Sequence, residues 1–233
     1  SVDDSLRTVS KRARGALVAF AKNPSLDANP LTSDTVLPET VTELRAKKSG
    51  YLQVIDTSGL EKCLGGQGYI YVLKSPGTHI LEGDVVALVS GHVEGGILDD
   101  LLSSFTFGDH RTYEQDAAFG LLVLSEIASK ALSPGINDSG TAIEAILRMK
   151  VLLWDFSRTQ PSDKPASAQR VFVPVPEHQA LLEAAFSQVS RDGAGMIEVA
   201  LCLRKSLQAL CDVDDARLQT AACSLAGVAL KHC

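Results

Sequence analysis

Six polar residues on either side of one apolar stretch are the part of this sequence best able to do chemistry. They form a candidate polar pocket: Arg111, Thr112, Gln115, Asp116, Asn137 and Asp138. Asp116 could act as a general base, and His110 could supply a proton. The Arg111 guanidinium or the Asn137 amide could then hold an anionic group. This chemistry would suit a hydrolase or a lyase.

Each of these residues also has a structural interpretation. Thr112 and Gln115 have the spacing of a capping box, which predicts that a helix begins at Thr112. Asn137 and Asp138 are residue types that cap a following helix, and Arg111 can form an ordinary salt bridge. Capping residues are abundant in helical proteins, so the structural interpretation is favoured over a ligand site.

Two consecutive helices are predicted to hold the polar residues. Residues 117–132 are apolar on nearly every side, which predicts a central buried helix. The Ser-Pro-Gly sequence at 133–135 ends it, and a second helix is predicted over 140–158. Asp116 precedes Gly120 by one turn, so a backbone or a ligand could approach the carboxylate there. The loop between the two helices is expected to aim the exposed amides at the start of the second helix back towards the end of the first.

Known catalytic and metal-binding motifs do not occur. There is no G-x-S-x-G, Walker A or H-E-x-x-H pattern, and the five histidines lack the spacing of metal ligands. Neither a metal nor a cofactor is therefore predicted. The glycine-rich segment 65–68 precedes a predicted strand, whereas a dinucleotide-binding loop would follow one, so it is interpreted as a turn.

Charge and cysteine content exclude further classes. The net charge is -6 and the aromatic content is 5%, which argues against nucleic acid as a partner because phosphate binding needs a basic face. The five cysteines show no C-x-x-C spacing, so neither a disulfide framework nor a zinc site is expected. Apolar neighbours around Cys63, Cys202 and Cys223 predict reduced core thiols, which fits a cytoplasmic location.

Hydrophobic periodicity divides the chain into three parts. Residues 1–45 are predicted to form an amphipathic helix and a Pro-rich linker, and the helix either packs on the domain or lies on lipid head groups. Residues 46–94 alternate short strand patterns with Gly and Pro turns, which predicts a small β module resembling a barrel-sandwich. Residues 95–233 carry helical periodicity and predict an all-α bundle. The fold class is therefore α+β.

The motifs themselves resemble a known family. The segments FGDHRTYEQDAAFG and LSPGIND, with SGYLQVIDTSGLEKC upstream and FSQVSRDGAGMIEVALCLRKSLQAL downstream, resemble a bacterial predicted membrane protein family, domain of unknown function 2254. The resemblance covers residues 48–210. It implies a membrane anchor before this region, and no stretch of this chain approaches the ~18 consecutive apolar residues that a span requires. It implies no activity and no catalytic residue.

The sequence thus favours a binding or regulatory function over catalysis. We expect a soluble domain of a bacterial inner membrane protein, on the cytoplasmic side, that binds a small ligand or ion and self-associates through helix faces. The membrane contact would come through a segment outside this chain. The alternative is a hydrolase or lyase with its acid/base site around Asp116.

Overall fold

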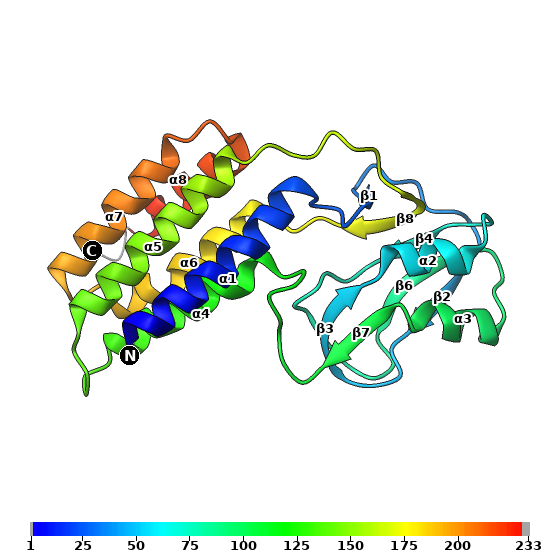
Figure 1. The fold of residues 1–233 in the computed structure, drawn as a ribbon, viewed down its shortest axis with the longest axis horizontal. Helices are drawn as coiled ribbons and strands as arrows, with labels where there is room; N and C mark the ends of the chain where they lie inside the picture. Colours follow the sequence, from blue (N-terminus) through cyan, green and yellow to red (C-terminus); the bar gives the residue numbers. More distant parts are fainter. Residues whose placement is uncertain (1, 230–233) are drawn as a thin grey trace. The chain divides into compact units, whose positions relative to one another are not determined.

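The computed structural model describes residues 2–229, which form two compact units (Figure 1). The helical unit contains residues 2–21, 117–160 and 177–229 of the described range. The mixed unit contains residues 22–116 and 161–176. The boundaries expected at 45/46 and 94/95 both fall inside the mixed unit, because the segments around them belong to the same sheets.

The mixed unit is built on two β-sheets. Its larger sheet has the order β1-β8-β4-β6-β2, and its smaller sheet the order β5-β3-β7. The strands of the larger sheet are β1 (Ala28–Leu31), β2 (Val41–Arg45), β4 (Ile70–Val72), β6 (Val85–Ser90) and β8 (Ala168–Pro174). The strands of the smaller sheet are β3 (Gly50–Ile55), β5 (His79–Ile80) and β7 (Phe105–Gly108). The strands β1, β8 and β4 run parallel to one another, and all other pairs are antiparallel.

Two short helices complete this unit. They are α2 (Thr57–Leu64) and α3 (Gly95–Leu102), and α2 packs on β8 and on α3. The Asp56 carboxylate caps α2 by accepting a bond from the Gly59 amide, and Gly65 ends it in the left-handed conformation. The sequence predicts one or two helical turns over 58–64, closed by Gly65 and Gly66, at this place. Apolar side chains from both sheets and both helices share one core.

The helical unit is a bundle. It consists of α1 (Val2–Lys22), α4 (Ala117–Ala131), α5 (Ser139–Arg158), α6 (His178–Asp192), α7 (Ile197–Cys211) and α8 (Ala216–Ala229). The helix α4 packs on α5 and α6, and α7 packs on α5 and α8. Fully buried side chains from different helices meet in one core: Leu6, Leu17, Leu121, Leu124, Ile146 and Phe186. The α+β class is confirmed.

The N-terminal helix α1 belongs to this bundle. Leu6, Ala13 and Leu17 are buried in the shared core, and the Phe20 ring stacks on Phe156 of α5 at 5.7 Å between centroids. The apolar stripe that periodicity identifies on this segment is therefore used for packing. Of the two interpretations of the basic amphipathic helix, the structure shows the one in which it packs on the domain.

Within residues 2–229, no helix combines the length and the apolar composition needed to cross a lipid bilayer.

Candidate functional site

Asp116 is held by Arg111 in a bidentate ion pair. Nε of Arg111 donates to Oδ2 at 2.8 Å, and Nη2 donates to Oδ1 at 2.9 Å. Asp116 is 6% exposed and the Arg111 side chain 24%. Both carboxylate oxygens thus accept charge-assisted bonds from one guanidinium, the strongest geometry available to such a pair. The contact that the sequence leaves open for Arg111 is a real salt bridge.

The carboxylate of Asp116 also lies against the backbone of Gly77. A Cβ atom placed on Gly77 would come 2.3 Å from Oδ2 of Asp116, and the residue has a φ of +95°. The turn that contains Gly77 is anchored on β3, because the Gly77 amide donates to the Leu52 carbonyl at 2.8 Å and the Leu52 amide donates to the Thr78 carbonyl at 2.9 Å. The close approach that we expect at Gly120 therefore takes place at Gly77 of the Ser-Pro-Gly-Thr turn.

Gln115 does not form the expected capping box. Its Oε1 accepts from the Ile55 amide at 2.8 Å, and its Nε2 donates to the Ile55 carbonyl at 3.1 Å, so it occupies both backbone groups at the end of β3. The helix α4 begins at Ala117, and the prediction of a start at Thr112 is wrong. The Thr112 Oγ1 atom is buried without a hydrogen-bond partner in the described part of the chain. The side-chain amide of Gln115, which a capping box would have used, is thus bonded to the backbone of Ile55 instead.

Asn137 and Asp138 form the turn between α4 and α5. Asn137 has a φ of +49°, and the Asp138 carboxylate caps α5 by accepting from the Thr141 amide at 3.0 Å and from the Thr141 hydroxyl at 2.6 Å. These bonds from Thr141 lower the pKa of Asp138 below its usual value. The capping interpretation is confirmed for Asp138, whereas Asn137 is a left-handed turn residue that precedes the cap.

The structure does not bring the six candidate residues together. Asp116 immediately precedes α4, whereas Asn137 and Asp138 follow it. Fifteen helical residues lie between. At a rise of about 1.5 Å per residue, that helix separates them by about 22 Å. Arg111, Gln115 and Asp116 form one cluster, while Asn137 and Asp138 form a separate helix cap. The His110 side chain is exposed, and its carbonyl accepts from Nε2 of Gln53.

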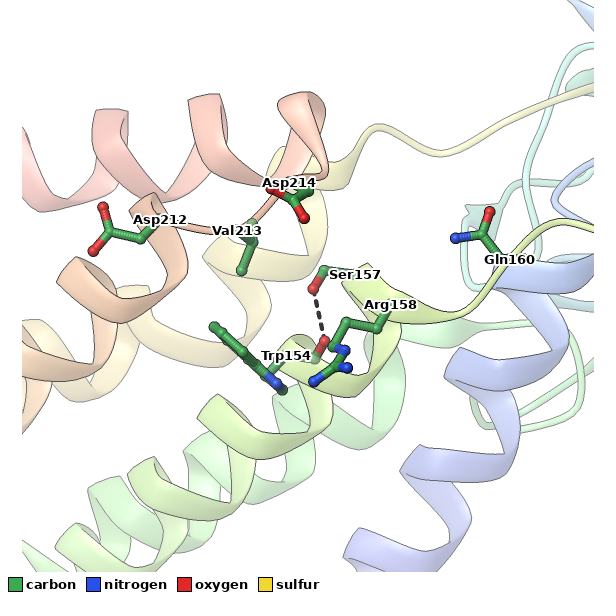
Figure 2. Close-up of a pocket in the computed structure, with 7 residues that line it drawn as sticks. All are labelled: Trp154, Ser157, Arg158, Gln160, Asp212, Val213 and Asp214. Carbon is green, nitrogen blue, oxygen red and sulfur yellow. Dashed lines mark hydrogen bonds between the residues drawn. The ribbon is translucent and has the colours of Figure 1, made fainter.

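A cavity that sequence reasoning missed lies at the C-terminal ends of α5 and α7. It has a volume of about 410 Å³ and is lined by Trp154, Ser157, Arg158, Gln160, Asp212, Val213 and Asp214. Figure 2 shows Trp154 and Arg158 on the last turns of α5, facing the α7–α8 connection that carries Val213 and Asp214. The Ser157 hydroxyl donates to the Trp154 carbonyl at 2.6 Å. The Gln160 side chain lies apart from this group in Figure 2.

The lining of this Trp154 pocket combines an aromatic wall with charges of both signs. Arg158 carries a positive charge, and Asp212 and Asp214 carry negative ones. Among residues 2–229 none of the three takes part in an ion pair. Two sequence signals could have pointed here: the single tryptophan with an arginine four residues later, and the acidic Asp-Val-Asp-Asp turn. Only the fold shows that they line one cavity.

The possible metal ligands and the cysteine thiols are spread over the described part of the chain. In the described ranges no group of three or more His, Cys, Asp or Glu side chains could hold a metal ion. Cys63 and Cys223 are exposed, so the expectation that they are core thiols is wrong, while Cys202 is half-buried. Burial, together with a hydrogen bond that the Cys211 thiol donates to Cys223, raises the pKa of Cys211 to about 12.

The His178 ring has aromatic neighbours and a shifted pKa. It packs edge-on against Phe20 and Phe156, with centroid distances of 6.3 and 5.2 Å. Burial lowers its pKa below the usual value, and the Asp215 carboxylate, 3.4 Å from Nδ1, opposes that shift only in part. His178 is therefore a partly buried ring that packs against Phe20 and Phe156 and is mostly neutral at pH 7.

Comparison with known proteins identifies relatives without a known activity. The sequence model of the DUF2254 family, described as a predicted membrane protein, matches residues 1–209. Uncharacterised proteins of Mycobacterium bovis and of two strains of Mycobacterium tuberculosis are 28% identical over 184 residues, which is 74% of this chain and 35% of each relative. The chain thus spans about a third of the length of these curated relatives. No solved structure matches it.

Proposed function

Because the chain belongs to the DUF2254 family of predicted membrane proteins, we propose that it is the part of a membrane protein that binds a small ligand and responds to it. The observation that carries this proposal is the Trp154 pocket. Its volume of about 410 Å³ lies within the usual range of small-molecule sites, and its lining offers aromatic, cationic and anionic groups in one place.

The chemistry of the lining favours a small zwitterion. Arg158 can bind a carboxylate with two parallel hydrogen bonds. Asp214 can accept bonds from an ammonium group, and the Trp154 ring can cover the apolar or cationic part between them. Free amino acids have this combination of groups, and betaines have the same charges with a quaternary ammonium that the Trp154 ring can cover. Binding of the ligand would be transmitted to the rest of the protein by a change in α5, the helix that carries both Trp154 and Arg158.

The single tryptophan makes this proposal directly testable. Titration of the chain with the standard free amino acids and with glycine betaine should give a saturable change in Trp154 fluorescence for at least one of them. Arg158→Gln or Asp214→Asn should weaken that binding about tenfold or more, the usual effect of losing one charged hydrogen bond. Arg204→Gln, an exposed change on α7 outside the lining, is the matched control and should leave the affinity unchanged.

Two results would refute the proposal. One is the absence of a saturable change with any of these probes. The other is equal affinity of the wild-type chain, Arg158→Gln and Asp214→Asn.

The alternative, a hydrolase or lyase with Asp116 as its base, has weaker support. The Asp116 carboxylate is 6% exposed and bonded through both oxygens to Arg111, which is the geometry of a structural ion pair. If Asp116 is architectural, Asp116→Asn lowers the free energy of unfolding and leaves ligand binding at Trp154 intact. A catalytic Asp116 would give the reverse pattern, a stable protein with a lost turnover.

Location and assembly follow as parts of the same proposal. The exposed thiols of Cys63 and Cys223 fit a reducing compartment, and therefore the cytoplasmic side of a bacterial inner membrane. Ile197 is 77% exposed and Leu201 42%, one turn apart on α7. Such an apolar pair fits self-association of the chain into a homo-oligomer. Sedimentation of the wild-type chain and of Leu201→Asp would test this part.

A further inference from the structure

Two cysteine side chains lie against each other in the helical unit. Cys211 is the last residue of α7, and Cys223 lies on α8, which packs on α7. The Cys211 thiol donates a hydrogen bond to the sulfur of Cys223. Both are free thiols, of which Cys211 is half-buried and Cys223 is exposed. The fold therefore holds two thiols in contact at the surface of the bundle.

The other two cysteines of the described range lie elsewhere. Cys63 belongs to the mixed unit. Cys202 precedes Cys211 by nine residues on α7, and at about 100° per residue their side chains leave opposite sides of that helix. Lys150 of α5 is among the charged neighbours of Cys202, so Cys202 lies on the α5 side of α7. The thiol in contact with Cys223 is therefore that of Cys211.

The two thiols in contact differ in reactivity. Burial and the bond to Cys223 raise the pKa of Cys211 to about 12, so Cys211 stays protonated at neutral pH. Cys223 is exposed, so an oxidant in solution reaches it first. An oxidised thiol with a second thiol in contact condenses to a disulfide before it is oxidised further.

We propose that Cys211 and Cys223 form a redox modification site, which a hydroperoxide oxidises to a reversible disulfide. The Cys223 thiolate attacks one peroxide oxygen and the O–O bond breaks. Cys223 becomes a sulfenic acid, and the other oxygen takes up the proton that Cys223 lost and leaves as water or an alcohol. The Cys211 sulfur then attacks the Cys223 sulfur, the S–O bond breaks, and the hydroxyl leaves as water with the Cys211 proton. A dithiol reductant restores both thiols by thiol–disulfide exchange.

The disulfide would close residues 211–223 into a covalent loop that contains the α7–α8 connection. Asp212, Val213 and Asp214 of this connection line the Trp154 pocket. Oxidation therefore restrains one wall of that pocket. Formation of the disulfide needs no ligand there, so either proposal can fail while the other stands.

Tryptic peptide mapping of the full chain tests the inference, because Arg217 is the only trypsin site between the two cysteines. Cleavage there places Cys211 in the peptide 206–217 and Cys223 in the peptide 218–231. After a stoichiometric amount of hydrogen peroxide and a thiol-blocking quench, the two peptides should be recovered joined, and they should separate on reduction. Linking should be about tenfold or more faster in the folded chain than in urea, because the fold holds the two sulfurs in contact.

Single substitutions separate the two steps. In Cys211→Ser the sulfenic acid of Cys223 has no second thiol beside it, so it should persist and react with dimedone. In the wild-type chain this label should decline as the disulfide forms. Cys202→Ser removes the other thiol of α7 and is the matched control, which should form the linked peptide as the wild type does.

The disulfide should also stabilise the helical unit. Oxidised wild-type chain should unfold at a urea concentration about 1–2 M higher than reduced chain when Trp154 fluorescence is followed, because the covalent loop restricts the unfolded chain. Peroxide should leave the urea midpoint of Cys223→Ser unchanged.

Four results would overturn the inference: no linked peptide in the folded chain, linking no faster than in urea, equal dimedone labelling of Cys223 in the wild type and Cys211→Ser, or a disulfide that joins Cys211 or Cys223 to another cysteine. An unchanged urea midpoint in the fully linked chain would overturn the restraint of the α7–α8 connection.

Discussion

Substitution of Gly77 by alanine should destabilise the mixed unit far more than substitution of Gly83. Both glycines have a positive φ, +95° and +89°, so alanine is strained at each. That strain costs about 1–2 kcal/mol. Only Gly77 has a neighbour in the way, because its new Cβ would lie 2.3 Å from Oδ2 of Asp116, whereas Gly83 has nothing within 4 Å. The difference between the two variants isolates the Asp116 contact.

The magnitude follows from the Arg111–Asp116 pair. Moving the Asp116 carboxylate away from Gly77 breaks two bonds to Arg111 in a largely buried site. Breaking a fully buried pair costs about 3–5 kcal/mol. Arg111 is 24% exposed, so water can solvate part of the guanidinium. This reduces the loss to about 2–4 kcal/mol. Gly77→Ala should therefore lower the free energy of unfolding by about 3–6 kcal/mol, and Gly83→Ala by about 1–2 kcal/mol.

The aromatic residues allow the two units to be observed separately. Tyr51, Tyr69, Tyr71 and Tyr113 all lie in the mixed unit, while Trp154 lies in the helical unit. Urea unfolding followed by tyrosine near-ultraviolet circular dichroism and by Trp154 fluorescence then gives one curve for each unit. Equal loss of stability in Gly77→Ala and Gly83→Ala would refute the reasoning. A large effect of Gly77→Ala that persists undiminished in the Asp116→Gly background would also refute it, because the clash would then be absent.

Two further predictions concern the helical unit. His178 has a lowered pKa in the folded state, so the unfolded chain takes up the proton more readily. The contribution of His178 to bundle stability should therefore be complete above the ordinary histidine pKa and fall as the pH drops below it. Unfolding followed by Trp154 fluorescence between about pH 7 and 5 should show this loss of stability in the wild type and a smaller loss in His178→Phe. Equal losses in the two proteins would contradict the prediction. Cys211, with its pKa raised to about 12, should resist iodoacetamide at pH 8 while the exposed Cys63 reacts. Peptide mass mapping measures both reactions. Rapid labelling of both cysteines in the folded chain would contradict the raised pKa of Cys211.

Local patterns in the sequence predicted most helices and several strands. The short strand patterns predicted over 46–94 include the segment that forms β6 (Val85–Ser90), and the helix expected over 140–158 is α5 (Ser139–Arg158). These elements have strong periodicity and clear end signals, such as the Asp138 cap, so they need little information from the rest of the chain.

The missed elements depend on distant partners. The strand β1 contains Pro30 and lies within the expected linker, but it forms the edge of the larger sheet, where a residue without an amide hydrogen is tolerated. It pairs with β8, about 140 residues later in the chain. The strand β7 lies within residues 95–233, for which the sequence predicts an all-α bundle, and it pairs with β3. No local pattern specifies pairings over such separations.

The candidate site shows the same limit for side chains. The sequence identifies Arg111, Gln115 and Asp116 as residues able to do chemistry, but it does not show whether their hydrogen-bonding groups are already occupied. In the fold the Gln115 side chain is hydrogen-bonded to the backbone of Ile55, and the Asp116 carboxylate is ion-paired with Arg111. A buried carboxylate bonded through both oxygens to one guanidinium has the geometry of a structural ion pair, which the sequence does not reveal.

An unoccupied charged group lies elsewhere, on α5. Arg158 has no ion-pair partner within the described residues. It lies beside a cavity that also has an aromatic wall, Trp154. Arg14 of α1 pairs with Asp155, the neighbour of Trp154. A ligand in the Trp154 pocket would therefore act directly on α5, and through the Arg14–Asp155 pair on α1 as well.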